Sequence, residues 1–284
     1  IRNLSAATPG TVGVSVEAPG PGAVIRVTQC IFRGLSTGFN LHMGIGLWSP
    51  GDGSLYAWNN VFYDFRGNAA NGGIGQLAGG FTAHAYNNTF YNCSFGLRQN
   101  AGVLAAKNNL VQACTDGYLG AFDPSSDYNL SDLAADAPGP NARNGAVVRF
   151  VAAGAGDFSL DPTDVQARDR GTDLSGDAVL PFGEDLAGDA RPFGVAWDIG
   201  ADEATTLATT STPTITLTPT ATPTATHSAS VTPTPSVTET PTPSGTPTMT
   251  ASRTPSPWSP PGCASRTSTA AWRTPGRSTP CCAG

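Results

Sequence analysis

The chain of 284 residues contains 34 Gly and 24 Pro but only 13% charged residues, a composition that favours turns and extended backbone over helix. Its net charge is −6, and the sequence offers no basic stripe for a phosphate backbone, so we expect no nucleic-acid partner. No apolar run approaches the roughly 20 residues that a bilayer span needs, so we expect no membrane span.

Composition divides the chain into three parts. Residues 1–203 carry the apolar residues that a core needs, and we expect them to form one domain. Residues 204–257 are dominated by Thr and Pro, which predicts an extended linker or stalk, and residues 258–284 predict an unstructured tail. The chain opens at Ile1 without a Met start or a leader, so we interpret the domain as truncated at its N-terminus.

A short phrase recurs along the domain and indicates a repeat. Its occurrences are Cys30-Ile31-Phe32, Asn60-Val61-Phe62, Asn88-Thr89-Phe90, Asn109-Leu110-Val111 and Asn129-Leu130-Ser131, which follow one another at intervals of 30, 28, 21 and 20 residues. Drifting intervals of this size are typical of solenoid coils. The repeats are too short for a crossover helix and lack helical periodicity, so they predict an all-β fold of stacked parallel coils.

The residues before each phrase alternate in character, as a strand with one buried face requires. The positions expected to point inward are Ile25, Leu55, Ala83 and Leu104, and then Val27, Ala57, Ala85 and Ala106. After each phrase come an apolar slot and a slot that we interpret as a turn with positive φ. The apolar slot holds Leu35, Phe65, Cys93 and Cys114, and the turn slot holds Gly38, Asn68, Gly96 and Gly117.

One column of the repeat is polar and consists of Asn60, Asn88, Asn109 and Asn129. Identical amides one coil apart can donate to and accept from each other, so the column predicts a hydrogen-bonded ladder that satisfies buried polar groups. The alternative is a set of solvated Asn residues in turns. Three cysteines, Cys30, Cys93 and Cys114, lie among apolar residues and are expected to be buried thiols.

The coil phrases and a set of later phrases resemble the right-handed parallel β-helix repeat family, to which pectate-lyase-like folds belong. The later phrases lie at residues 157–162, 169–171, 185–192 and 198–203, and they resemble the closing region of surface-exported β-helix proteins. The resemblance covers about residues 20–203. It implies the C-terminal part of a right-handed parallel β-helix and an extracellular or cell-surface location of bacterial type.

The acidic residues favour no catalytic site. The coils contain Asp52, Asp64, Asp116, Asp123 and Asp127, none of which is adjacent to another acid, so we expect no catalytic residues. A later acidic run could hold Ca²⁺, although its spacing fits no EF-hand loop. It comprises Asp157, Asp161, Asp164, Asp169, Asp173, Asp177, Glu184, Asp185 and Asp189. Its alternative is a solvated acidic loop that binds no metal, with no cofactor in the domain.

The candidate binding surface is an outward double row of side chains. One column contains Arg26, Tyr56 and His84, and the column beside it contains Thr28, Trp58, Tyr86 and Lys107. Members of a column should stand one coil, about 4.8 Å, apart. Aromatic faces stack on sugar rings and cations bind carboxylates, so the rows predict a glycan-binding surface. The alternative is that these aromatic residues pack under a neighbouring loop.

These observations favour a non-catalytic surface or secreted protein, an adhesion or polysaccharide-binding head on a stalk, with a polysaccharide or cell-surface glycan as its partner. Two alternatives stay open: the C-terminal part of a polysaccharide lyase or glycoside hydrolase, and a purely structural spacer. A truncated β-helix would also expose unpaired amides and the apolar pair Ile25 and Val27 in its first coil. The sequence therefore predicts end-to-end self-association.

Overall fold

The computed structural model describes residues 11–17, 20, 22–34, 42–48 and 52–205. The expected stalk from residue 206 onward and the expected tail lie outside the described residues, as do Leu35 and Gly38 of the predicted slots. Within the described part, no helix is long and apolar enough to cross a membrane.

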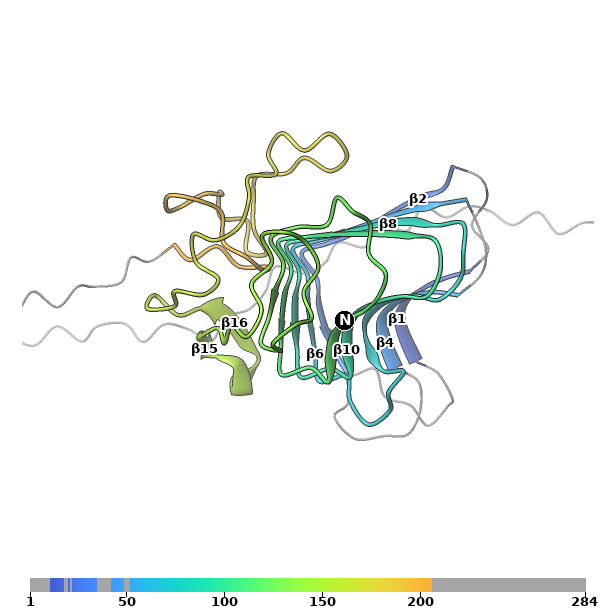
Figure 1. The fold of residues 1–284 in the computed structure, drawn as a ribbon, viewed down its shortest axis with the longest axis horizontal. Coiled ribbons are helices and arrows are strands. Elements are labelled where there is room, and N and C mark those ends of the chain that lie inside the picture. The colour runs from blue at the N-terminus through green and yellow to red at the C-terminus, as the bar shows by residue number, and fades with distance from the viewer. Residues whose placement is uncertain (1–10, 18–19, 21, 35–41, 49–51, 206–284) are drawn as a thin grey trace, which may run out of the picture. The chain divides into compact units, whose positions relative to one another are not determined.

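Three parallel sheets form the walls of a β-helix (Figure 1). Each of the first four described coils contributes one strand to each sheet, and the fifth contributes strands to sheets A and C. Sheet A contains β1 (Thr11–Val16), β4 (His42–Leu47), β7 (Gly72–Gln76), β10 (Phe95–Gln99) and β13 (Asp116–Gly120). Sheet B contains β2 (Val24–Thr28), β5 (Ser54–Trp58), β8 (Thr82–Tyr86) and β11 (Val103–Lys107). Sheet C contains β3 (Ile31–Arg33), β6 (Val61–Tyr63), β9 (Thr89–Tyr91), β12 (Leu110–Gln112) and β14 (Leu130–Ser131). The predicted all-β parallel β-helix is confirmed.

The register of sheet B matches the predicted columns. Ile25 pairs with Leu55, Leu55 with Ala83, and Ala83 with Leu104, and the neighbouring outward column pairs in the same order. The recurring phrases form sheet C, in which Phe62 stacks between Phe32 and Phe90 with ring centroids 4.8 and 5.0 Å away. Like side chains therefore stack on like side chains along the interior.

Sheet A is built differently from the turn that the sequence suggested. Gly96 and Gly117 lie inside β10 and β13 without positive φ, so the predicted turn at these two positions is wrong. They belong to a column of glycines at equivalent places in all five strands, which also contains Gly13, Gly44 and Gly73. A Cβ atom at Gly44 or Gly73 would lie 2.2 or 2.3 Å from the ring of Phe62 or Phe90. The glycines leave the room that the stacked Phe rings of sheet C occupy.

The Asn column forms a hydrogen-bonded ladder between sheets B and C. The Nδ2 atoms of Asn60, Asn88 and Asn109 each donate to the Oδ1 atom of the Asn one coil further on, at 3.0 Å. The same Oδ1 atoms accept from the backbone N–H groups of the preceding coil at 3.1 Å. All four Asn residues, including Asn129, are fully buried, so the alternative of solvated turns is wrong.

The chain then leaves the coils and folds back over their outer faces. We call residues 146–205 the closing segment. It begins with an antiparallel hairpin of β15 (Phe150–Ala152) and β16 (Asp157–Leu160), joined by a short 3-10 turn at Ala153–Ala155. Phe158 of β16 packs on Tyr63 and Tyr91 at the outer face of sheet C, with ring centroids 5.0 and 5.3 Å away. The rest of the segment, drawn in yellow and orange in Figure 1, is irregular.

Candidate functional site

The first column of the predicted binding surface stacks on itself. The rings of Tyr56 and His84 are 5.2 Å apart and nearly parallel, at 9°. The guanidinium carbon of Arg26 lies 5.5 Å from the centroid of the Tyr56 ring, in the position of a cation–π contact. Both faces of Tyr56 are therefore in contact with neighbours in its own column, and the expectation that this ring offers a face to a sugar is wrong.

The second column is partly covered by the closing segment. Tyr86 is 1% exposed and packs with Leu174, Leu180 and Trp197. Burial also raises the pKa of the Tyr86 hydroxyl well above its usual range, so the hydroxyl stays protonated. The expectation of an exposed Tyr86 is therefore wrong. At this position the alternative holds, because the ring packs under the closing segment.

Lys107 ends the second column in an ion pair. Its Nζ atom lies 2.7 Å from an Asp177 carboxylate oxygen of the closing segment and 5.1 Å from the centroid of the Tyr86 ring. The charge of Lys107 is thus compensated where it stands. His84 lies in the same neighbourhood, and its Nδ1 atom is 3.3 Å from the Tyr86 hydroxyl. Burial lowers the pKa of the His84 imidazole, which favours its neutral form.

Trp58 remains accessible and lines a groove between sheet B and the closing segment. Its indole is half-buried, and the ring of Phe182 faces it at 6.3 Å between centroids with a tilt of 42°. The groove has a volume of about 480 Å³. Its lining includes Thr28, Gln29, Trp58, Asn59, Phe182 and Glu184. We refer to this cleft as the Trp58 groove. It combines two aromatic walls with amide, hydroxyl and carboxylate groups.

A row of amide side chains from the coils binds the closing segment, which forms one wall of the groove. Gln29, Asn59, Asn87 and Asn108 occupy equivalent corners of four successive coils, with φ between 48° and 53°. The Gln29 and Asn59 amides donate to the carbonyl oxygens of Asp185 and Glu184, at 3.0 and 2.6 Å. Further along, Asn87 donates to the carbonyls of Asp198 and Gly200, and Asn108 to that of Thr172. The closing segment is therefore bound to four coils.

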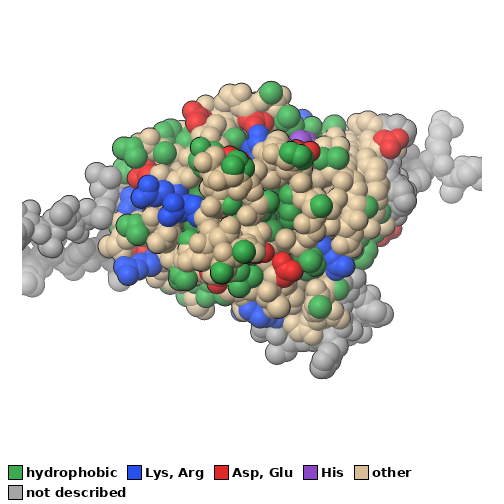
Figure 2. Space-filling view, viewed as in Figure 1, with side chains coloured by type: hydrophobic (Ala, Val, Ile, Leu, Met, Phe, Trp, Pro, Cys, Tyr) green, Lys and Arg blue, Asp and Glu red, His purple; other side chains and the backbone are tan. Residues whose placement is uncertain are grey.

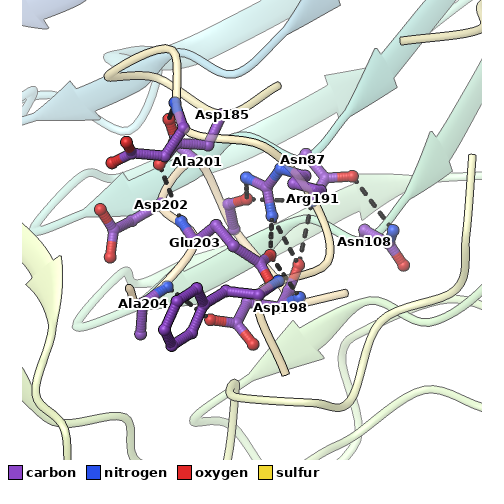
Figure 3. Close-up of polar contacts among 12 residues, drawn as sticks. Asn87, Asn108, Asp185, Arg191, Asp198, Ala201, Asp202, Glu203 and Ala204 are labelled. Atoms are coloured by element: carbon purple, nitrogen blue, oxygen red, sulfur yellow. Dashed lines mark hydrogen bonds and ion pairs between the residues drawn. The ribbon is translucent and has the colours of Figure 1, made fainter. Parts of the chain in front are cut away.

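Behind these amides, Arg191 organises the C-terminal end of the closing segment (Figure 3). The guanidinium is buried, and one of its nitrogens lies 2.8 Å from a Glu203 carboxylate oxygen. The other terminal nitrogen donates to the Gly200 carbonyl at 2.9 Å. Glu203 also accepts the backbone N–H groups of Asp198 and Phe193, at 3.0 and 2.9 Å. A buried pair with this many partners holds the loop in one geometry.

Two carboxyl groups near Arg191 titrate at unusual pH. Burial, reinforced by the neighbouring Glu203 carboxylate, raises the pKa of Asp198 to about 6. Burial also raises the pKa of Asp202 to about 7, with a further contribution from Asp185. Both accept backbone N–H groups, Asp198 from Asp169 and Ala204 and Asp202 from Leu160. These residues join distant parts of the segment.

Acidic side chains of the closing segment accept hydrogen bonds from its backbone. Asp185 accepts the N–H groups of the three residues that follow Leu186 in its turn and that of Glu203. Asp164 accepts three N–H groups of the residues that follow it and, from before the hairpin, that of Arg149. Among the described residues, no three His, Cys, Asp or Glu side chains are grouped so that they could hold a metal ion. Several of these acids are thus hydrogen-bonded to the backbone of the closing segment, which a solvated loop would not show.

One acidic pair arises only in the folded chain. Asp116 of β13 contacts Asp136 from the loop after β14, and burial together with the Asp136 carboxyl raises the pKa of Asp116. Asp136 also accepts the Ser131 hydroxyl at 2.5 Å and the Tyr118 N–H at 3.0 Å. This contact could not be predicted from the sequence, because the two acids are separated by a whole coil. These hydrogen bonds join β13 and β14 of the last coil through Asp136.

The surface around these features carries no dominant charge. On the face drawn in Figure 2, acidic and basic side chains are interspersed with apolar and uncharged groups.

Comparison with known proteins identifies no relative: no family model matches the chain, no curated protein matches it, and no solved structure matches it.

Proposed function

We propose that the domain is a non-catalytic glycan-binding head of an extracellular or cell-surface protein with a pectate-lyase-like β-helix, and that the Trp58 groove is its binding site. The observation that carries the proposal is the accessible indole of Trp58 beside Phe182 in a cleft of about 480 Å³. Small-ligand sites commonly measure about 300–1,000 Å³ and combine apolar walls with a few polar groups.

The rigidity of the walls supports this assignment. Trp58 lies on β5, whose two neighbours in sheet B fix its backbone on both sides. Phe182 is held from behind by Trp197, with ring centroids 5.2 Å apart. Two aromatic rings fixed in this way can hold a sugar ring with little loss of conformational entropy on binding. Thr28 and Gln29 also line the groove, and the Gln29 amide is held by its hydrogen bond to the Asp185 carbonyl.

Replacing Trp58 with Ala tests the proposal. Because a stacked ring contributes about 0.5–1.5 kcal/mol, we expect Trp58→Ala to weaken glycan binding about three- to tenfold, and Trp58→Phe to retain part of the affinity. Titration calorimetry with oligosaccharides selected on a glycan array measures the change. Thermal unfolding of each variant shows whether the loss comes from the site or from the fold.

Phe193→Ala is the matched control, because Phe193 is an aromatic residue of the closing segment that is 45% exposed and does not line the groove. It should bind as the wild type does. Equal affinity of Trp58→Ala and wild type for every glycan that binds would refute the proposal. Release of unsaturated products from a uronate polymer would favour the lyase alternative instead.

A further inference from the structure

The Trp58 groove has one charged side chain in its described lining, the carboxylate of Glu184. This side chain is exposed, while its backbone carbonyl is fixed by the Asn59 amide at 2.6 Å. The Asn59 hydrogen bond therefore fixes the backbone of Glu184 at the groove, while its carboxylate remains accessible. Glu184, Trp58 and Phe182 all line the same groove.

The positive charges near the groove are engaged elsewhere. The guanidinium of Arg26 lies over the Tyr56 ring, outside the lining. Arg191 is buried and paired with Glu203, and Lys107 is paired with Asp177. A carboxylate on a ligand would thus meet Glu184 and a chain of net charge −6. A cation would meet Glu184 together with the faces of Trp58 and Phe182, which attract positive charge.

We propose that the groove selects glycans that carry protonated amino sugars over neutral glycans, and neutral glycans over uronates. This inference rests on the proposed glycan-binding function and adds the class of sugar. The sugar ring would stack on the accessible aromatic surface that Trp58 and Phe182 form together, and its ammonium group would bind the Glu184 carboxylate. A protonated amino group is the common sugar substituent whose positive charge is attracted both by a carboxylate and by aromatic faces.

A matched set of ligands tests the charge preference. Oligomers of glucosamine and of N-acetylglucosamine share ring and linkage but differ in charge, and oligogalacturonate carries the opposite charge. We expect the glucosamine oligomer to bind about three- to fivefold more tightly than its acetylated counterpart at low salt, the range of one partly exposed ion pair. The difference should shrink as salt is added, and oligogalacturonate should bind most weakly.

The variant Glu184→Gln keeps the size and hydrogen-bonding capacity of the side chain but removes its charge. It should abolish the preference for the free amine and leave binding of the N-acetylglucosamine oligomer unchanged. Arg26→Gln is the control and should change neither. If Arg26→Gln lowers affinity and Glu184→Gln does not, the ligand is anionic and the inference is wrong.

The two proposals fail in different ways. Binding that depends on Trp58 but is equal for the free and acetylated amines, or strongest for oligogalacturonate, overturns the sugar class and leaves the glycan site intact. Binding of every oligomer that is independent of Trp58, or no binding of any, overturns both proposals.

Discussion

Asn88 uses its amide fully, which shows how much one residue of a coil can contribute. Its Oδ1 atom accepts the backbone N–H and the side-chain amide of Asn60, and its Nδ2 atom donates to Asn109 and to the Ala57 carbonyl. Four polar partners in a fully buried position are thus satisfied by a single side chain. Burying such groups unpaired would cost about 1–3 kcal/mol each.

We expect Asn88→Ala to lower the free energy of unfolding by about 2–4 kcal/mol, because it removes the acceptor of the Asn60 backbone N–H and one hydrogen bond each from the Asn60 amide and the Ala57 carbonyl. Denaturant titration measures the change. Asn100→Ala is the control, since Asn100 is exposed and accepts only from Arg98, and its effect should stay within about 0.5 kcal/mol. Equal stability of the two variants would contradict a structural role for the ladder.

The two rows of amides differ in how far the sequence could predict them. The ladder residues repeat in one column and bond to one another within it. The recurrence of Asn at the interval of one coil was therefore sufficient to predict their hydrogen bonds. The neighbouring row also repeats, as Asn59, Asn87 and Asn108, and Asn108 donates to Asn87 within it. The other partners of its amide donors are carbonyls between residues 172 and 200. The coil sequence contains no signal for partners so far along the chain. The burial of Tyr86 under the closing segment could not be predicted for the same reason.

At the scale of the strand, the sequence predicted sheet B in register and misassigned part of sheet A. Sheet B alternates large apolar and polar side chains, which is a direct signal of one buried face. In sheet A the glycines Gly96 and Gly117 sit inside strands where a Cβ atom has no room. Such an atom would lie 2.9 Å from Val111 of sheet C in both cases, and at Gly117 it would also lie 2.2 Å from an Asp136 carboxylate oxygen. Glycine alone does not distinguish a turn from a close approach of two walls.

The closing segment is expected to make stability depend on pH. The pKa values of Asp198 and Asp202 are raised to about 6 and about 7 by burial, so both carboxyls bind protons more tightly in the folded chain. Their contribution is therefore largest when they are protonated and is lost as pH rises through 6 to 7. We expect stability to increase by on the order of 2 kcal/mol between pH 8 and pH 5.

Asp202→Asn should reduce this dependence, because Asn stays neutral and can still accept the Leu160 N–H. His42 and His84 act in the opposite direction, since burial lowers the pKa of both, and subtracting the variant from the wild type removes their effect. The control is Asp189→Asn at an exposed position. Thermal unfolding at several pH values measures the slopes, and a slope unaltered in Asp202→Asn would contradict the assignment.

For the molecule as a whole, the first described coil lies at one edge of all three sheets. Among the described residues, β1, β2 and β3 each have a neighbouring strand on one side only. The Asn ladder also stops there, because Cys30 occupies the position before Asn60 and donates its N–H without offering an amide. Unpaired strand edges of this kind are templates for another chain.

We expect the chain to self-associate at tens of micromolar through this end, as measured by sedimentation velocity. Val24 lies on the edge strand β2 and is 50% exposed, so Val24→Lys should shift the population toward monomer. Val179→Lys changes an equally exposed Val, at 47%, in the closing segment and should have no effect. A monomeric wild-type chain would mean that another part of the chain covers the edge.

The attachment of the closing segment to four coils also has a mechanical consequence. Gln29, Asn59, Asn87 and Asn108 each hold the segment through their own hydrogen bonds, and the described segment ends at Thr205. Tension applied beyond Thr205 therefore first reaches the bonds of Asn87 to Asp198 and Gly200, and only then the contacts at residues 185, 184 and 172. A solenoid pulled by its last coil would instead peel open one rung at a time.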